Sequence, residues 1–512
     1  MRAAQTGHEA MTPMNALSRH ATTRPDGTAF IHDGAVWTYR DLLRDVEQLS
    51  REFLARGVRP RDRVVIHMPN RPEIAVALCA CFRIGAIACP TNLRFKTTEL
   101  REVFQRLRPA LYLGEEQLYS QVEPIEPEIL GSERRFVTGP SSAFESALPW
   151  SMLVADGDGT RPLPAAPADD SPAVLMTTSG TTGRPKFVAH TAATLSATAE
   201  ALARPDFDTP QTLLNACPMV HSSGLFTFLL SLEHGAPMVM VERFDPETVL
   251  DRVEQHGCTW LPGLPFMHNA LLEHQRKRPR NVSSLRRCLC GGDVCPIQLQ
   301  LEFEATFGAP LSNLWAATEV GGALAVGLRP GPVVRIAPGA QIRLVDDAGR
   351  DAPRGEVGEL LVRGPNVTVG YWMGPDRLDD ATRDGWYHSG DLMRQGEGDE
   401  LWFVGRKKDI IIRGGSNISP VEVERVLMSH LLVRDAAVFG MPDPVLGQRV
   451  AAVVQLSSDA GVAALADILR DTKKQLADYK TPERLWVVDR IPRNSVGKVD
   501  RRAAAEILDR AP

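Results

Sequence analysis

Short apolar runs alternate with amphipathic helical patterns along this chain, and that alternation limits its fold more than any other feature. Near the N-terminus, a helix-capping pattern at residues 38–41 (TYRD) opens a run of apolar residues at helical spacing that ends at Gly57. A β-branched run, residues 63–68 (RVVIHM), follows it. Further along, a helical pattern over residues 246–256 lies between two strand patterns. The sequence therefore predicts a layered α/β fold.

A change of pattern near residue 405 predicts a domain boundary. At about 150 residues per unit, a chain of 512 residues suggests about three units. Strand-like segments separated by glycines precede the change, and a short charged segment with its own helix and strand patterns follows it. We expect a large composite N-terminal domain over residues 1–404, made of two layered α/β subdomains and a small β-rich subdomain. A small α+β domain, predicted to be mobile, covers residues 405–512.

Charge and hydropathy argue against several partners. Lys and Arg number 58 and Asp and Glu number 63, a net charge of −5, so no basic excess favours nucleic acid. The most apolar stretches are interrupted by Arg83 and by Glu233, which predicts no transmembrane segment. The N-terminus has no apolar run of the signal-peptide kind and the eight cysteines form no C-x-x-C pair, so we expect a cytoplasmic protein with reduced thiols. A homodimer is left open.

The most informative segment is residues 177–186 (TTSGTTGRPK), which follows the apolar run 173–176. Its glycines let backbone N–H groups turn toward an anion, its hydroxyls add donors and its lysine adds positive charge. The spacing is not that of a Walker loop. The segment predicts a phosphate-binding loop, with a flexible linker as the alternative. Its candidate binding residues are Thr178, Ser179, Gly180, Thr181, Thr182, Gly183 and Lys186.

Six further segments follow this loop in a fixed order. They are residues 218–225 (PMVHSSGL), 291–293 (GGD), 315–319 (WAATE), 385–392 (GWYHSGDL), 405–409 (GRKKD) and 492–498 (PRNSVGK). Together with the loop they resemble the motifs of the adenylate-forming superfamily, which contains acyl-CoA synthetases, peptide-synthetase adenylation domains and firefly-type luciferases. The resemblance extends over nearly the whole chain.

The resemblance implies a role for each matching residue on the nucleotide side. Gly291, Gly292 and Asp293 would lie beside adenine, and Trp315 would stack on it. Thr318 would bond the α-phosphate, and Glu319 would hold Mg²⁺ against the phosphates. Asp391 would accept hydrogen bonds from both ribose hydroxyls, with Arg406 also contacting the ribose. Taken singly, each has an ordinary alternative, such as a turn for the glycine pair or a solvated carboxylate for Asp391.

The resemblance also implies how the remaining groups act. His221 would line the carboxylate pocket, and Lys498 would be the lysine of the adenylation step. Lys408 falls on the hinge position, and Gly414 and Gly415 would open a path for a pantetheine arm.

Two of the departures from the family pattern concern the pocket and the phosphate loop. Tryptophan and Ala316 stand where tyrosine and glycine are usual, and the added methyl group could narrow the acyl pocket. Phe187 stands where glycine usually follows the loop lysine, a change that the sequence alone does not explain.

The predicted function is an ATP-dependent carboxylate–CoA ligase that forms an acyl-AMP and then a thioester, with ATP, Mg²⁺ and coenzyme A taking part. One alternative is a related enzyme, which adenylates the acid and loads it onto a separate carrier protein. A second alternative is a protein that binds nucleotides and has no catalytic activity. Apolar residues near the pocket motifs favour a medium-chain fatty acid or an aryl acid, with core packing as their ordinary explanation. These residues are Leu225, Phe226, Phe228, Leu264, Phe266 and Met267.

Overall fold

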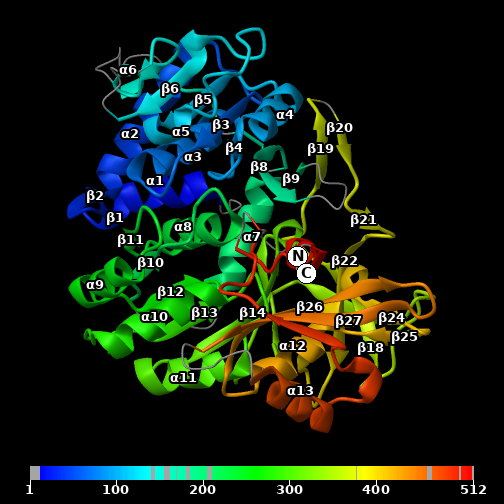
Figure 1. Ribbon diagram of the computed structural model, residues 1–512. Coiled ribbons are helices and arrows are strands. Elements are labelled where there is room, and N and C mark those ends of the chain that lie inside the picture. The colour runs from blue at the N-terminus through cyan, green and yellow to red at the C-terminus, as the bar shows by residue number, and fades with distance from the viewer. Residues whose placement is uncertain are drawn as a thin grey trace, which may run out of the picture.

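A computed structural model describes most of the chain, in four β-sheets with helices packed around them (Figure 1). The described residues are 12–139, 144–154, 162–165, 167–168, 170–179, 185–203, 210–375, 377–457, 464–494 and 497–509.

The N-terminal sheet has nine strands in the order β20-β19-β9-β8-β4-β3-β5-β6-β7. Its strands from β8 through β7 are parallel, whereas β9, β19 and β20 add in antiparallel fashion. Its bounds are β3 Arg63–His67, β4 Ile87–Pro90, β5 Leu111–Glu115, β6 Arg135–Thr138, β7 Leu148–Pro149, β8 Pro172–Ser179, β9 Pro185–Thr191, β19 Gly370–Gly374 and β20 Arg377–Asp379.

The central sheet also has nine strands, in the order β16-β15-β14-β13-β12-β10-β11-β1-β2. Its strands from β1 through β14 in this order are parallel, and β2, β15 and β16 are antiparallel additions at its ends. Its bounds are β1 Thr28–His32, β2 Ala35–Thr38, β10 Leu213–Asn215, β11 Met238–Met240, β12 Trp260–Gly263, β13 Arg287–Cys290, β14 Leu311–Ala317, β15 Gly322–Val326 and β16 Arg335–Ile336.

Helices pack against these two sheets. They are α1 Pro13–Thr23, α2 Tyr39–Ala55, α3 Pro72–Ile84, α4 Thr97–Leu107, α5 Glu116–Tyr119, α6 Ser151–Val154, α7 Ala192–Ala203, α8 Ser222–His234, α9 Pro246–His256, α10 Pro265–Lys277 and α11 Ile297–Phe307. On β3, Val64 and Ile66 join one apolar core and Val65 joins another, so both faces of the strand are covered. Burial on both faces explains why this strand is a continuous apolar run rather than an alternating one.

Two smaller sheets complete the molecule. The β-rich sheet consists of β17 Gln341–Val345, β18 Val357–Arg363, β21 Thr382–Arg383, β22 Trp386–Gln395 and β23 Leu401–Arg406. The last part of the chain, residues 411–509, is called here the C-terminal unit, and everything before it the body. The unit contains β24 Ile411–Arg413, β25 Ser416–Ile418, α12 Pro420–Met428, β26 Val433–Asp443, β27 Gly447–Leu456, α13 Ala464–Gln475, β28 Arg484–Val487 and α14 Arg501–Asp509.

Local sequence signals fix several of these elements. Asp245 accepts a hydrogen bond from the Thr248 N–H and so caps α9, Pro246 opens its first turn, and Gly257 follows its last residue with φ +58°. The helix therefore occupies the predicted residues 246–256. The predicted capping pattern at the start of α2 is also present, between Thr38 and Asp41.

The predicted fold class is confirmed: two layered α/β parts, a β-rich sheet and a small α+β unit are all present. The exact domain boundary stays a prediction; β23 ends at Arg406 and the next strand begins at Ile411. The eight cysteines are buried and unpaired thiols. Within the described part of the chain, no helix is both long and apolar enough to span a membrane.

Three fully buried histidines make the stability of the fold sensitive to acid. Burial lowers the pKa of His67, His190 and His268 to about 4 each, from an ordinary value of 6.5. Between these values the unfolded chain binds protons that the folded chain excludes, so stability is lost as the pH falls from about 6.5 toward about 4. We expect a loss of up to about 1.4 kcal/mol per pH unit for each histidine. Urea unfolding at pH 7 and pH 5 measures it, and equal unfolding free energies would contradict it.

Candidate active site

A cavity of about 1070 Å³ lies where the N-terminal, central and β-rich sheets meet the C-terminal unit. Residues that the sequence predicted as site residues line it from all four parts: Thr178, Lys186, His221, Gly291, Gly292, Thr318, Glu319, Asp391, Arg406, Lys408 and Lys498. Ser179 is the last residue of β8. Gly180, Thr181, Thr182 and Gly183 lie outside the described residues. Segments more than 300 residues apart in the sequence therefore contribute to one cavity.

One end of the cavity centres on Asp391, the residue predicted to hold the ribose, which is only 5% exposed. The Trp315 indole N–H donates to Asp391 Oδ2 at 2.9 Å, and Arg406 Nε lies 3.0 Å from Oδ1. Burial raises the pKa of Asp391, and Arg406 and the indole N–H act in the opposite direction. Its carboxylate oxygens are thus held in place at the cavity wall.

The stacking role of Trp315 stays a prediction, and the structure shows the contacts that its side chain makes. Its side chain is 7% exposed and packs in the core beneath the β-rich sheet. Among the described residues that line the cavity are its strand neighbours Leu314 and Ala316, but not Trp315. The indole N–H thus supports the Asp391 carboxylate at the cavity wall.

A tyrosine that the sequence analysis did not single out joins two predicted site residues. The Tyr371 hydroxyl on β19 donates to Glu319 Oε1 at 3.2 Å. Lys186 Nζ lies 4.4 Å from the centre of the Tyr371 ring. Tyr371 therefore fixes the spacing between a cavity carboxylate and a cavity ammonium group. Tyr371 reaches this place because β19 pairs with the edge of β9, and no local sequence signal indicates that pairing.

Thr318 is also held by a residue that the motifs did not reveal. His190 Nε2 lies 2.8 Å from the Thr318 carbonyl oxygen, and Nδ1 lies 3.2 Å from Thr194 Oγ1. Because the pKa of His190 is lowered to about 4, the imidazole is neutral at pH 7 and donates from Nε2. The backbone that carries Thr318 and Glu319 is thereby fixed to β9.

Lys498 and His221 meet at the cavity from opposite sides of the C-terminal interface. Burial lowers the pKa of Lys498, and the Arg406 guanidinium lowers it further. Burial lowers the pKa of His221 to about 4, with Arg94 and Lys498 adding to the shift, so the imidazole is neutral at pH 7. Three carboxylates raise the pKa of Lys498: Asp293, Asp391 and Glu319.

Three other predicted residues lie away from the cavity wall. Gly414 and Gly415 form the turn between β24 and β25, where the Gly414 N–H donates to the Leu446 carbonyl oxygen at 2.8 Å. Asp293 follows the glycine pair but points toward the C-terminal unit, where its Oδ2 accepts the Val499 N–H at 3.1 Å. The predicted contacts of these residues with the nucleotide and with the pantetheine arm stay predictions.

The structure accounts for both departures from the family pattern. Phe187 is 1% exposed and packs in the core on the far side of the N-terminal sheet, with the Arg106 guanidinium 4.6 Å from its ring centre. It therefore fills a core position rather than the site. Ala316 does line the cavity, as predicted.

The apolar part of the cavity is built mainly on α8. Phe226 and Leu230 lie one turn apart on the face of this helix that lines the cavity, and Trp260 on β12 lines it as well. Of the six predicted apolar residues, four line the cavity: Phe226, Leu264, Phe266 and Met267. Leu225 and Phe228 instead pack in the core, which was the alternative explanation for them.

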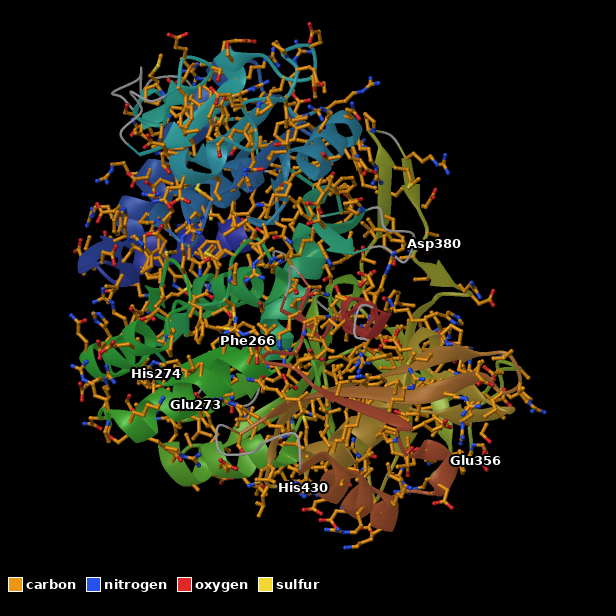
Figure 2. The ribbon with its side chains drawn as sticks, viewed as in Figure 1. Phe266, Glu273, His274, Glu356, Asp380 and His430 are labelled. Carbon is orange, nitrogen blue, oxygen red and sulfur yellow. The ribbon has the colours of Figure 1, made fainter. Side chains whose placement is uncertain are left out.

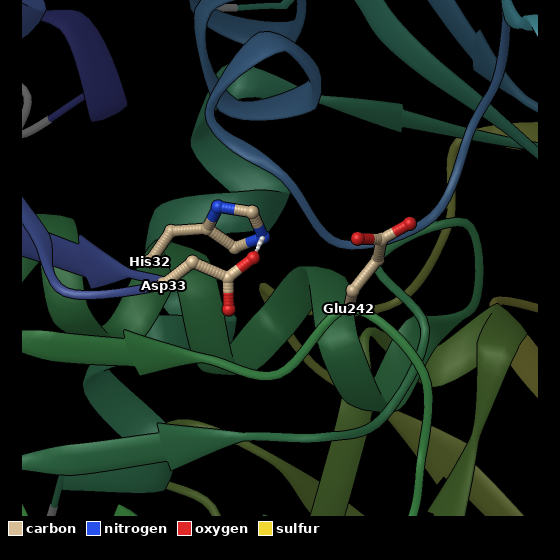
Figure 3. A group of neighbouring side chains, drawn as sticks. All are labelled: His32, Asp33 and Glu242. Carbon is tan, nitrogen blue, oxygen red and sulfur yellow. Dashed lines mark ion pairs between the residues drawn. The ribbon is translucent and has the colours of Figure 1, made fainter.

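Glu319 fits the predicted magnesium site. It faces the cavity, and Oε2 has no partner among the described residues, which leaves that oxygen for a hard cation. A separate group, His32, Asp33 and Glu242, has ligand atoms within 4.8 Å of one another (Figure 3). Asp33 in that group is 71% exposed and already pairs with Arg252 at 3.4 Å, so we assign the group no role.

Comparison with known proteins agrees with this geometry. Residues 17–372 match the model of the AMP-binding enzyme family, and residues 422–498 match that of the AMP-binding enzyme C-terminal domain. The medium-chain fatty-acid–CoA ligase of Escherichia coli is 32% identical over 510 residues, covering 94% of this chain and 88% of that protein. The feruloyl-CoA synthase of an Amycolatopsis species is 33% identical over 489 residues, covering 94% and 96%.

A solved structure shows the same fold. The O-succinylbenzoate coenzyme A synthetase of Bacillus subtilis, in complex with ATP and a magnesium ion, has a TM-score of 0.82 and 28% sequence identity, covering 95% of this chain and 98% of that one. The family models alone match well over half of the residues. The chain therefore belongs to the AMP-binding enzyme family and is an AMP-forming acid–CoA ligase.

Proposed function

We propose that this enzyme activates a hydrophobic carboxylic acid, a medium-chain fatty acid or an aryl acid, through an acyl-AMP and then transfers the acyl group to coenzyme A. One observation supports this most: a single cavity joins a polar part, which includes the basic side chains Lys186, Arg406 and Lys498 and the carboxylates Glu319 and Asp391, to an apolar part along α8. ATP and the acid's carboxylate would meet where the two parts join.

The polar part suits a reaction between two anions. The acid's carboxylate oxygen attacks the α-phosphorus of ATP, a new P–O bond forms, and pyrophosphate leaves. Lys186, Arg406 and Lys498 face this part and would offset the negative charge that gathers as the two reactants approach. Mg²⁺ held by Glu319 would neutralise charge on the phosphates. Thr318 would bond the α-phosphate, and Asp391 would hold the ribose.

The apolar part suits an extended or flat acyl group. The face of α8 that lines the cavity runs from His221, which caps the helix, to Leu230, a rise of about 13 Å. The helix N-terminus favours a carboxylate near His221, with the apolar tail lying along the helix toward Leu230. A tail of this length and character matches a medium-chain or aryl acid.

In the second half-reaction a thiol attacks the acyl carbon. The C–S bond forms, the bond from the acyl carbon to the phosphate oxygen breaks, and AMP leaves. Lys498 would then occupy space close to the reacting carbon. We infer that the C-terminal unit turns about Lys408, which removes Lys498 and brings the turn at Gly414 and Gly415 toward the thiol.

A panel of acids tests the proposal directly. With ATP, Mg²⁺ and coenzyme A, the enzyme should form AMP and acyl-CoA fastest with medium-chain fatty acids or aryl acids. Adenylate formation without a thioester to coenzyme A would refute the ligase function and favour a carrier-protein acceptor. Thioester formation confined to short or polar acids would refute the hydrophobic substrate.

Leu230 provides a matched pair of variants for the acyl branch. Leu230→Trp fills the end of the α8 face and should reduce kcat/KM most for the longest accepted acids, leaving shorter ones nearly unchanged. Leu230→Ala should shift the preference toward longer acids. An unchanged preference in both variants would show that the acyl group does not lie along α8.

A further inference from the structure

Asp293 makes its contacts across the interface between the body and the C-terminal unit. It follows β13 and the glycine pair of the body, and its side chain is 20% exposed. Oδ2 accepts the Val499 N–H at 3.1 Å, and Arg493 Nη1 lies 3.5 Å from the same oxygen. Within the body, its described side-chain contact is local, from the Val294 N–H to Oδ1 at 2.9 Å. Its long-range partners are therefore in the C-terminal unit.

The segment that Asp293 contacts is a tight turn that carries Lys498. The Asn494 N–H donates to the Lys498 carbonyl oxygen at 2.8 Å, and the Lys498 N–H donates to Asn494 Oδ1 at 3.1 Å. Arg493 donates to the Gly497 carbonyl oxygen at 3.0 Å. Because Val499 directly follows Lys498, the bond from Asp293 to its N–H fixes the backbone beside the lysine.

The fit of this turn against the body leaves little room for variation. Gly497 has φ +84°, and a Cβ there would lie 2.9 Å from a ring atom of Phe266 on α10. The turn thus rests on Phe266 on one side and on Asp293 on the other. Figure 2 labels Phe266 and Glu273 on this helix. Glu273 pairs with Arg434 of β26, a second contact across the interface.

Charge connects Asp293 to the core of the C-terminal unit. Arg493 lies between two carboxylates, Asp293 of the body and Asp435 of β26, with 2.7 Å to the latter. A partly desolvated arginine between two carboxylates gains more from both than an exposed pair would. The contacts of Asp293 with Val499 and Arg493 exist only while Lys498 is in the cavity, since any turn of the unit that withdraws Lys498 also withdraws these two residues.

We propose that Asp293 is a positioning residue for the adenylation half-reaction: it docks the turn that carries Lys498 and holds the C-terminal unit in the orientation that places this lysine in the site. This role is proposed in place of the adenine contact expected from the sequence. The proposal rests on the function proposed above, because it assigns Lys498 to adenylation and not to thioester formation.

The test compares Asp293→Ala with Asp293→Asn in the full-length enzyme. Asn keeps an acceptor for the Val499 N–H but loses the ion pair, so it should fall between the wild type and Ala. For Ala we expect adenylation, measured by ATP–pyrophosphate exchange, to fall about 10- to 100-fold. Thioester formation from supplied acyl-AMP and coenzyme A should stay nearly unchanged. Glu302→Gln, which breaks a pair with Arg276 inside the body, is the control.

Two further measurements separate the alternatives. The Kd of ATP should be unchanged in Asp293→Ala, whereas a direct adenine contact would raise it and overturn the proposal. Fluorescence energy transfer between labels on the body and on the C-terminal unit should show fewer molecules in the present orientation.

Failure of this proposal and failure of the proposed function give different results. An equal fall in both half-reactions, or no fall in adenylation, would refute the docking role while wild-type acyl-CoA synthesis still supports the function. A wild-type enzyme that forms adenylates but no acyl-CoA would refute the proposed function. The role of Asp293 could then still be tested by ATP–pyrophosphate exchange and by fluorescence energy transfer.

Discussion

Replacing Lys498 by alanine is expected to lower the rate of acyl-AMP formation by about 10²- to 10³-fold. Two anions must approach each other in this step, and Lys498 is the cation that the C-terminal unit contributes to the cavity beside Arg406 of β23. Burial makes its charge more effective, because fewer water molecules screen it. ATP–pyrophosphate exchange with an accepted acid measures this rate.

The second half-reaction should survive the same substitution. Thioester formation from supplied acyl-AMP and coenzyme A does not need Lys498, since no second anion then attacks phosphorus. Lys474→Ala is a suitable control, because Lys474 is exposed on α13 and pairs only locally, with Asp471 at 2.7 Å. If Lys498→Ala reduced both half-reactions equally, the lysine would not be specific to adenylation and the inferred turn of the C-terminal unit would lose its basis.

Glu319→Gln is expected to raise the Mg²⁺ concentration needed for half-maximal adenylation and to lower the maximal rate by roughly 100-fold. The amide keeps the size of the side chain but removes the negative charge, which is what a hard cation requires of this ligand. Titrating Mg²⁺ at fixed ATP and acid concentrations measures both effects. An unchanged Mg²⁺ dependence would place the metal elsewhere.

Tyr371→Phe is the matched companion of this variant. Phenylalanine keeps the ring under Lys186 but removes the hydroxyl that donates to Glu319. We expect a shift of the Mg²⁺ dependence in the same direction but smaller, about tenfold, as is typical when a partner of a metal ligand is removed. A larger effect from Tyr371→Phe than from Glu319→Gln would show that the tyrosine acts on the phosphates itself.

Elements whose boundaries depend on neighbouring residues could be predicted from the sequence. Helix α9 has its cap, its proline and its terminal glycine in or directly beside its own segment, and it occupies the predicted residues 246–256. The order of strands could not be predicted in this way. That β9 pairs with β19, or β1 with β11, depends on contacts between segments more than 180 residues apart.

The candidate site divides along the same line. Motif residues such as Glu319, Asp391 and Lys498 lie in recognisable local patterns, and the structure places them on one cavity. The residues that hold the motif residues in place do not lie in such patterns. Tyr371 and His190 reach the site through the pairing of their strands.

Two predicted site residues have partners that their motifs did not indicate. The Trp315 indole N–H donates to Asp391, which lies 76 residues further along the chain. Asp293 lies beside a glycine pair in the sequence, yet its hydrogen-bond partner is 206 residues away. Local sequence cannot reveal a partner at that distance.

The pairing of β19 with β9 also has a consequence for how this protein is made. Val188 of β9 lies opposite Tyr371, so a chain still emerging from the ribosome leaves that edge of β9 open until residue 371 has appeared. Open strand edges are where incomplete chains associate with one another. The same delay applies to nucleotide binding, because Tyr371 and Glu319 cannot meet earlier. Biosynthesis thus passes through nearly three quarters of the chain before this side of the site can close.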